Sequence, residues 1–333
     1  MFGWRRARRP EAGGPAPGGL AAGGALGEAR AEALLRRLEW TVIRRLDGLL
    51  QGDYRTLMRG FGLDLADLRE YQPGDDVRHM DWNVTARLQT PYVREFQEDR
   101  EISAWFLLDL SGSVDFGSGD VRKRTMLHDF TAVMARLLSR NGNRVGAVLY
   151  GGAADGTAPA VPARTGRRHL LHLLHRLRAA PAGPRGQTRL GDLLERGQAV
   201  AGRRSLVFVV SDFISEPGWE RPLGLLAQRH EVVAVRLLDP LEAALPDLGL
   251  VVLQDAETGE QLFVDTHDAT FRRRFSQAAQ AREATLAQAF ANAGVDCLAL
   301  PTDARLDLAL LAFANRRRRR ASASAVGAGR VVA

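Results

Sequence analysis

Short apolar runs alternate along the chain with segments whose apolar residues recur at helical spacing, from about residue 103 to residue 315. Uninterrupted apolar runs are typical of buried strands, and a period near 3.6 residues is typical of amphipathic helices. The pattern predicts buried strands at 103–109, 144–150, 206–211, 231–237 and 295–300. It predicts helices at 120–141, 167–180, 189–202, 222–229, 268–293 and 303–315.

Apolar strands that alternate with helices predict a doubly wound α/β fold, in which helices cover both faces of a mostly parallel sheet. Two further short apolar runs, 250–254 and 261–264, flank a Glu-Thr-Gly turn and predict a hairpin. Upstream, apolar residues at helical spacing predict an amphipathic helix over 28–50. In parallel sheets ligands bind at the carboxyl ends of the strands, and a functional site is expected there.

Composition divides the chain into four parts. Residues 1–27 are rich in Gly, Pro and Ala and are expected to form a disordered tail. Residues 28–100 form an N-terminal segment with a distinctive motif, and 101–315 form the α/β domain. Residues 316–333 form an Arg-rich tail.

The content of single residue types excludes several functions. Lys123 is the only lysine, and Arg122 precedes it, so no Walker A motif exists and we expect no nucleotide hydrolysis by this chain alone. Cys297 is the only cysteine, which rules out an internal disulfide and fits a reducing compartment. We find neither a secretory signal nor an apolar run as long as a membrane span, so we expect a cytoplasmic protein.

The formal net charge of +7 is concentrated at the two ends, because the arginines of 1–27 and 316–333 leave the body of the chain slightly acidic. Such tails can bind nucleic acid or an acidic surface. Since no aromatic residues are interleaved with these arginines, we favour solvated tails, and nucleic acid is not the expected partner.

Polar side chains follow two of the predicted strands. Asp109, Ser111 and Ser113 leave the first strand at alternating positions, Asp212 follows the third strand, and Thr188 precedes a helix. Oxygen donors with few negative charges suit a hard cation, for which Mg²⁺ is the usual ion. Each hydroxyl taken alone has another interpretation, because Ser and Thr often cap the helix that follows them.

Together these five positions resemble the metal-ion-dependent adhesion site of von Willebrand factor A domains: D-x-S-x-S, a lone Thr, then an Asp after a hydrophobic strand. The resemblance implies a von Willebrand factor A-like fold and a site that binds without catalysing. It implies that Asp109, Ser111, Ser113 and Thr188 hold Mg²⁺, with Mn²⁺ or Ca²⁺ as alternatives, and that Asp212 acts through water. One coordination position is left for a carboxylate of another protein.

A second motif, R-E-Y-Q-P-G-D-D-V-R-H-M-D-W, begins at residue 69. It resembles the hallmark of a bacterial family known as domain of unknown function fifty-eight, where it precedes a von Willebrand factor A-like domain. Genes of that family typically lie beside those of MoxR-type AAA+ ATPases. The acids and arginines of the motif predict a structural ion-pair network around a Pro-Gly turn, with an apolar tryptophan anchor, or alternatively a partner-docking surface. The residues concerned are Arg69, Tyr71, Pro73, Gly74, Asp75, Asp76, Arg78, Asp81, Trp82 and Arg87.

The resemblances imply a non-enzymatic, Mg²⁺-dependent adaptor that links a MoxR-type AAA+ ATPase to a client protein during remodelling or maturation. One alternative is a Mg²⁺-dependent phosphohydrolase with Asp109 as nucleophile, but haloacid-dehalogenase phosphatases use D-x-D-x-[TV], and Ser111 stands where the second Asp is needed. Another alternative is binding of nucleic acid or an acidic surface by the Arg-rich tails, which predicts a steep dependence on salt.

Overall fold

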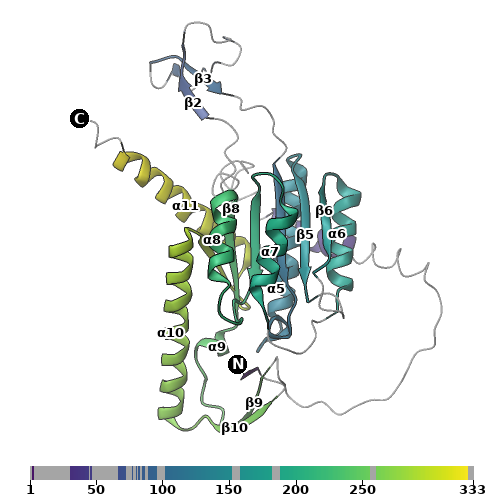
Figure 1. Ribbon diagram of the computed structural model, residues 1–333, viewed down its shortest axis with the longest axis vertical. Coiled ribbons are helices and arrows are strands. Elements are labelled where there is room, and N and C mark those ends of the chain that lie inside the picture. The colour runs from purple at the N-terminus through teal and green to yellow at the C-terminus, as the bar shows by residue number, and fades with distance from the viewer. Residues whose placement is uncertain are drawn as a thin grey trace, which may run out of the picture. The chain divides into compact units, whose positions relative to one another are not determined.

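The computed structural model in Figure 1 divides into two compact units. The first contains 1–46 and 103–309, and the second contains 47–102 and 310–333. Residues 1–46 therefore group with the α/β part of the chain. The residues that the structure describes are 2–3, 31–44, 46, 67–72, 77, 80, 82, 85–86, 89–95, 102–151, 158–181, 188–255 and 260–328. Apart from residues 2–3, the predicted tail 1–27 lies outside them.

A six-stranded sheet forms the centre of the first unit, and its strands follow the order β11-β8-β7-β4-β5-β6. All neighbouring strands are parallel except β6, which is antiparallel to β5. This confirms the mostly parallel sheet that the apolar runs predicted. The strands are β4 (Ser103–Asp109), β5 (Arg144–Tyr150), β6 (Ala160–Arg164), β7 (Leu206–Ser211), β8 (Glu231–Leu238) and β11 (Asp296–Pro301).

The edge strand β6 was not predicted, because it is only five residues long and contains Pro162. Proline has no backbone N–H to donate, so within sheets it is confined to places such as an edge. The sequence pattern that identifies a buried strand is therefore absent here.

Helices cover both faces of the sheet. One face carries α5 (Lys123–Arg140), against which α6 (Arg167–Ala179) packs, and the other carries α7 (Leu190–Val200), α8 (Glu220–Arg229) and α10 (Ala269–Ala293) (Figure 1). Successive side chains of β4 point to opposite faces, as a strand requires. Phe106 stacks on Phe208 with ring centroids 5.1 Å apart, and the Phe130 ring of α5 meets both edge-on.

On the other face, Trp105 and Leu107 pack with residues of α7, α8 and α10 in one apolar cluster. Helix α7 approaches β4 closely at Gly197, where a Cβ atom would lie 2.4 Å from the Leu107 side chain. Because Leu107 is fully buried, it has no room to move aside. Glycine at this position is what lets the helix sit against the strand.

The N-terminal amphipathic helix is confirmed over the described residues 31–44 and 46, and it includes a π-helical turn, η1 (Glu39–Ile43). The remaining positions of the predicted range 28–50 lie outside the described residues. Its predicted apolar side chains are buried, namely Leu34, Leu35, Leu38, Val42 and Leu46. Arg37 donates two hydrogen bonds to the Asp129 carboxylate of α5, at 2.7 and 2.8 Å. The helix is therefore fixed to the α5 face of the sheet by both apolar and charged contacts.

The predicted hairpin is also present, as β9 (Leu250–Asp255) paired with β10 (Gln261–Asp265). A third short strand, β1 (Phe2–Gly3), pairs with the other edge of β9. A one-turn helix that was not predicted, α9 (Pro240–Ala243), lies between β8 and this hairpin in the chain.

The second unit contains a two-stranded antiparallel ribbon of β2 (Asp67–Glu70) and β3 (Tyr92–Glu95). The last helix, α11 (Leu306–Ala328), starts in the first unit and does not end at Asn315 as predicted. It continues through the five arginines at 316–320, since Arg and Ala both have high helix propensity. Of the helices in the described residues, none is both long and apolar enough to cross a membrane.

Candidate metal centre

The candidate site lies where the chain changes direction within the sheet. From the central strand β4 the chain continues to β5 on one side, and it later returns to β7 on the other side. Such switch points leave a crevice at the carboxyl ends of the two strands, where ligands bind in open α/β sheets. Asp109 ends β4 and Asp212 directly follows β7, and both side chains are fully buried.

Hydrogen bonds connect three of the predicted residues. The Asp109 carboxylate accepts the Ser111 backbone N–H at 3.0 Å and the Ser211 hydroxyl at 2.6 Å. The hydroxyls of Ser111 and Ser113 are 3.1 Å apart, and both side chains are buried. The D-x-S-x-S segment therefore folds so that its oxygen atoms gather at the strand end.

Thr188 belongs to the same edge of the sheet and is also buried. Its carbonyl oxygen accepts hydrogen bonds from the Ser215 hydroxyl and the Glu216 backbone N–H, both at 2.9 Å, in the segment that follows Asp212. The next residue, Arg189, donates its backbone N–H to the hydroxyl of Tyr150, the last residue of β5. The Thr188 loop is thereby held between the ends of β5 and β7.

The helix-capping interpretation of the hydroxyls is wrong for the two positions where it can be examined directly. Ser111 precedes the short 3₁₀ turn η3 (Gly112–Asp115), but its side chain makes no cap hydrogen bond. The N-cap of α7 is Arg189, not Thr188, and the first helical N–H, that of Leu190, donates to the Ser215 hydroxyl. Capping of the following helical turn therefore does not explain these two residues.

The two carboxylates affect each other. Burial first and the negative charge of Asp212 second raise the pKa of Asp109, and against the opposing effect of the hydrogen bonds from Ser211 and Ser111 it reaches about 6. A buried carboxylate beside another is destabilised in its charged form. A cation bound between them would relieve that repulsion.

Lys123 is a part of this site that the sequence analysis missed. Its side chain is fully buried, and its ammonium lies 2.7 Å from Asp212 Oδ2 and 2.8 Å from Glu242 Oε1. Burial alone would lower the pKa of Lys123, but the charges of Asp212 and Glu242 outweigh it and the pKa is raised, so the ammonium stays protonated. Lysine occurs only at this position in a chain so rich in arginine. This could have indicated that the position needs a lysine side chain in particular.

Asp239 extends the row of polar residues to the next strand. It follows β8, is fully buried, and accepts hydrogen bonds from the Ser118 backbone and hydroxyl, the Leu241 backbone and the Thr302 hydroxyl. It also forms a capping box with Glu242 in α9. The rule that identified Asp109 and Asp212, an acid directly after a buried strand, would have identified Asp239 as well. The Thr302 hydroxyl that donates to Asp239 lies directly after β11.

The donor set fits a hard divalent cation. It comprises two buried carboxylates, from Asp109 and Asp212, and three buried hydroxyl side chains, from Ser111, Ser113 and Thr188. All of these donors are oxygen atoms, which Mg²⁺ prefers. Among the described residues, His, Cys, Asp and Glu form no group of three or more that could hold a metal ion, so a site here depends on the hydroxyls.

Most of the second predicted motif cannot be compared with the structure. Pro73, Gly74, Asp75, Asp76, Arg78, Asp81 and Arg87 lie outside the described residues, and of Arg69 only the backbone is described. Tyr71 donates its backbone N–H to the Pro91 carbonyl at 2.8 Å, which closes the end of the β2–β3 ribbon. The expectation of Trp82 as an apolar anchor is wrong, because 68% of this residue is exposed and a ring in water anchors no core.

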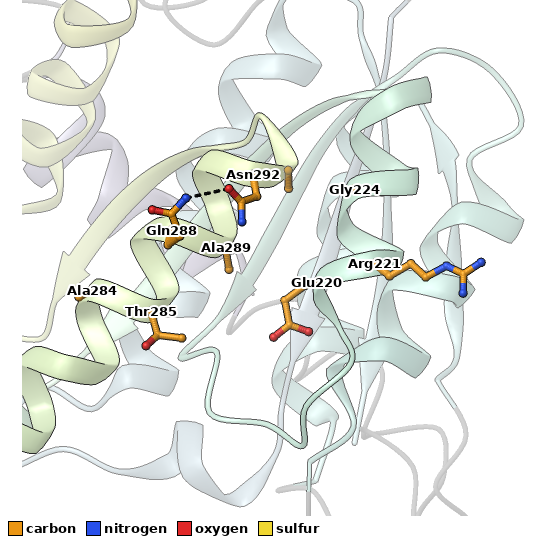
Figure 2. Close-up of a pocket in the computed structure, with 9 residues that line it drawn as sticks. Glu220, Arg221, Gly224, Ala284, Thr285, Gln288, Ala289 and Asn292 are labelled. Carbon is orange, nitrogen blue, oxygen red and sulfur yellow. Dashed lines mark hydrogen bonds between the residues drawn. The ribbon is translucent and has the colours of Figure 1, made fainter.

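A groove in the first unit lies away from these donors, between α8 and α10 (Figure 2). Small side chains of α10, Ala284, Ala289 and Ala293, form part of its wall, and the Gln288 amide donates to Asn292 at 2.8 Å. None of the predicted metal ligands lines it.

Comparison with known proteins gives a family match and close relatives. A family model described as "Protein of unknown function DUF58" matches residues 67–285. Uncharacterized proteins of Mycobacterium tuberculosis (Rv1480) and Mycobacterium bovis (Mb1516) are each 41% identical over 304 residues, covering 90% of this chain and 94% of theirs. Among solved structures, the conserved hypothetical protein BatB from Bacteroides thetaiotaomicron matches 66% of this chain and 99% of its own, at 14% identity and a TM-score of 0.40. That score is too low to bear on the fold.

Proposed function

The chain belongs to the DUF58 family, and we propose that it is a non-enzymatic, Mg²⁺-dependent adaptor that joins a MoxR-type AAA+ ATPase to a client protein. The proposal includes a von Willebrand factor A-like arrangement of the site. The observation that supports it most is the set of buried oxygen donors at the switch point between β4 and β7.

Each residue has a defined part in this proposal. Asp109, Ser111, Ser113 and Thr188 would hold the ion, with Asp212 acting through water. When bound, Mg²⁺ would supply a coordination position for a carboxylate of the client. Asp109 is the one carboxylate among the proposed direct ligands, and a cation that its direct ligands neutralise only partly still attracts a carboxylate.

The catalytic alternative lacks a required group. A phosphohydrolase that used Asp109 as nucleophile would need a second carboxylic acid as proton donor two residues later, and Ser111 is there. Both Asp109 oxygens also accept hydrogen bonds, from Ser111 and Ser211, which lowers their nucleophilicity. Asp109-dependent turnover of a phosphomonoester would contradict the adaptor proposal.

A capture experiment with the full chain tests the proposal. Purified protein is immobilised and offered a purified MoxR-type ATPase, with and without a cell extract that contains candidate client proteins, in Mg²⁺ or in EDTA. We expect capture in Mg²⁺ that EDTA abolishes and Asp109→Asn reduces at least tenfold. Asparagine is the suitable replacement because alanine would leave the buried Ser111 N–H and Ser211 hydroxyl without their acceptor.

The matched control is Asp268→Asn, which makes the same chemical change at an exposed residue. Asp268 caps α10 by accepting the Thr270 N–H, and asparagine caps equally well. The control should capture as the unmodified protein does. Capture that ignores both EDTA and Asp109→Asn would refute the metal-dependent part of the proposal.

A further inference from the structure

Lys123 is the first residue of α5, and the local backbone fixes its position at the candidate metal centre. Its N–H donates to the Phe116 carbonyl at 2.9 Å, and its ammonium lies 5.7 Å from the centre of the Phe116 ring. The side chain then reaches Asp212 and Glu242, with no exposed surface.

A buried lysine is an expensive way to stabilise a fold. Removing two charges from water costs several kcal/mol per ion, and a buried ion pair is often replaceable by apolar residues without loss of stability. Lysine occurs once in the chain, and its charge here is fully buried. This indicates that the charge has a role other than packing. The contact with Asp212 connects that role to the proposed metal site.

The contacts of Asp212 show what the lysine does to the donor set. Asp212 Oδ1 accepts the Ile214 backbone N–H at 3.1 Å, and Oδ2 accepts the Lys123 ammonium at 2.7 Å. Both oxygens of this carboxylate are therefore engaged before any ion arrives. The ammonium also cancels the charge that Asp212 would offer, which leaves Asp109 as the main negative charge for an incoming cation.

We propose that Lys123 is a built-in counter-ion that keeps the affinity of the Asp109–Asp212 site for a free divalent cation low, so that firm binding requires a carboxylate from a partner. This inference rests on the proposed function and adds its regulation. The partner's carboxylate supplies the negative charge that Lys123 has cancelled. Metal and partner then bind cooperatively, and each strengthens the other by the same factor.

The same counter-ion explains how the site persists without metal. Two buried carboxylates with no cation would repel each other, whereas the ammonium compensates Asp212 in the metal-free protein. Glu242 holds the ammonium from the other side and is itself fixed in the α9 capping box, where it accepts the Asp239 N–H at 3.1 Å.

A pair of variants separates the charge of Lys123 from the other charges. The double variant Lys123→Met/Glu242→Gln removes one positive and one negative charge, so the local net charge is unchanged while Asp212 loses its cation. The single variant Glu242→Gln leaves the ammonium on Asp212 and can keep the capping box, since glutamine also serves at that position. Both are made in the full chain.

The probe is Mn²⁺ or Mg²⁺ alone, measured by isothermal titration calorimetry. We expect the double variant to bind at least tenfold more tightly than the unmodified protein, and Glu242→Gln to bind equally or more weakly. Thermal melts in EDTA and in about 5 mM Mn²⁺, above the roughly 0.1 to 1 mM dissociation constants of weak divalent-cation sites, provide a second measurement. The double variant should melt lower in EDTA and gain more from Mn²⁺ than the unmodified protein does.

Two results would overturn the inference, and they are distinguishable. Equal affinity of the unmodified protein and the double variant would show that Lys123 does not limit metal binding, while the adaptor proposal would stand. No binding by either protein, with no change in melting, would remove the inference together with the metal-dependent part of the proposed function.

Discussion

At the scale of single residues, Asp109 is an ionisable group that the fold removes entirely from water. It is fully buried, lies near the charge of Asp212, and its pKa is raised to about 6, from burial first and from Asp212 second. In the unfolded chain the pKa of an Asp is near 3.9. Folding therefore favours the protonated carboxyl, and the stability that this contributes is complete below about pH 4.

We expect the metal-free protein to lose this contribution as the pH rises from about 4 through about 6. Because one pKa unit corresponds to about 1.4 kcal/mol, the loss is on the order of 2 to 3 kcal/mol. In the Asp109→Asn variant the side chain is neutral at every pH in this range, so the variant does not lose stability in this way. Melting temperatures in EDTA between about pH 4 and pH 8 should thus fall for the unmodified protein relative to the variant, and Mg²⁺ should remove the difference at neutral pH. A constant difference across this range would contradict the assignment.

Residue types and spacing were sufficient to predict that the candidate donors Asp109 and Asp212 stand at strand ends, because acids after buried strands stand out in the sequence. Lys123, Glu242 and Asp239 were not predicted as part of the site. The contact between Lys123 and Asp212 joins residues 89 positions apart and depends on how α5 enters the site. Only the three-dimensional structure brings these charges together.

At the scale of elements, the contact between α7 and β4 controls how the site's central strand is held. Gly197 faces Leu107 at the contact, and Leu107 lies two residues before Asp109. Gly191 on the same helix has open space where a Cβ would be. The two glycines therefore make a matched pair.

We expect Gly197→Ala to destabilise the protein by about 1 to 3 kcal/mol, because overpacking a rigid core outweighs the gain in helix propensity. Gly191→Ala should be neutral or stabilising, by at most about 1 kcal/mol. Urea denaturation of both variants measures the free energy of unfolding. Equal effects of the two substitutions would show that the close approach of α7 to β4 does not exclude a side chain at position 197.

Element prediction succeeded where apolar periodicity was strong. The bounds expected for β4, β5 and β7 were those observed, since each is an uninterrupted apolar run. It failed for β6 and α9, which are short and contain proline, and for the end of α11. The arginines at 316–320 were interpreted as part of a tail because they are charged, whereas arginine is also a good helix former.

At the scale of the whole molecule, the chain begins on the α/β unit and returns to it after residues 47–102. The helix over 31–44 and Leu46 contribute seven buried apolar residues, Ala31, Leu34, Leu35, Leu38, Val42, Ile43 and Leu46. Composition alone had assigned this helix to the N-terminal segment. Its docking on α5 depends on contacts, such as Arg37 with Asp129, that local sequence does not specify.

Deleting residues 1–46 should destabilise the first unit by several kcal/mol, whereas deleting 1–30 should have a small effect. Each buried leucine, valine or isoleucine contributes about 1.5 to 3 kcal/mol before the entropy of ordering, and a whole domain has only about 5 to 15 kcal/mol. Melting temperature and soluble yield of the two truncated proteins provide the comparison. Similar behaviour of both would show that the docked helix is dispensable.

The residue after Asp212 links the site to a natural fluorophore. Phe213 adopts a left-handed backbone conformation, with φ of 53°, and its ring centroid lies 5.5 Å from that of Trp219 and 4.9 Å from that of Phe290 on α10. Trp219 is itself buried at 5% exposure, so its emission responds to packing changes and little to solvent. We expect an ion or partner that displaces Asp212 to move Phe213 against this indole. Because Trp219 is one of five tryptophans, site occupancy would then be followed in the unlabelled protein as a change in the total tryptophan fluorescence.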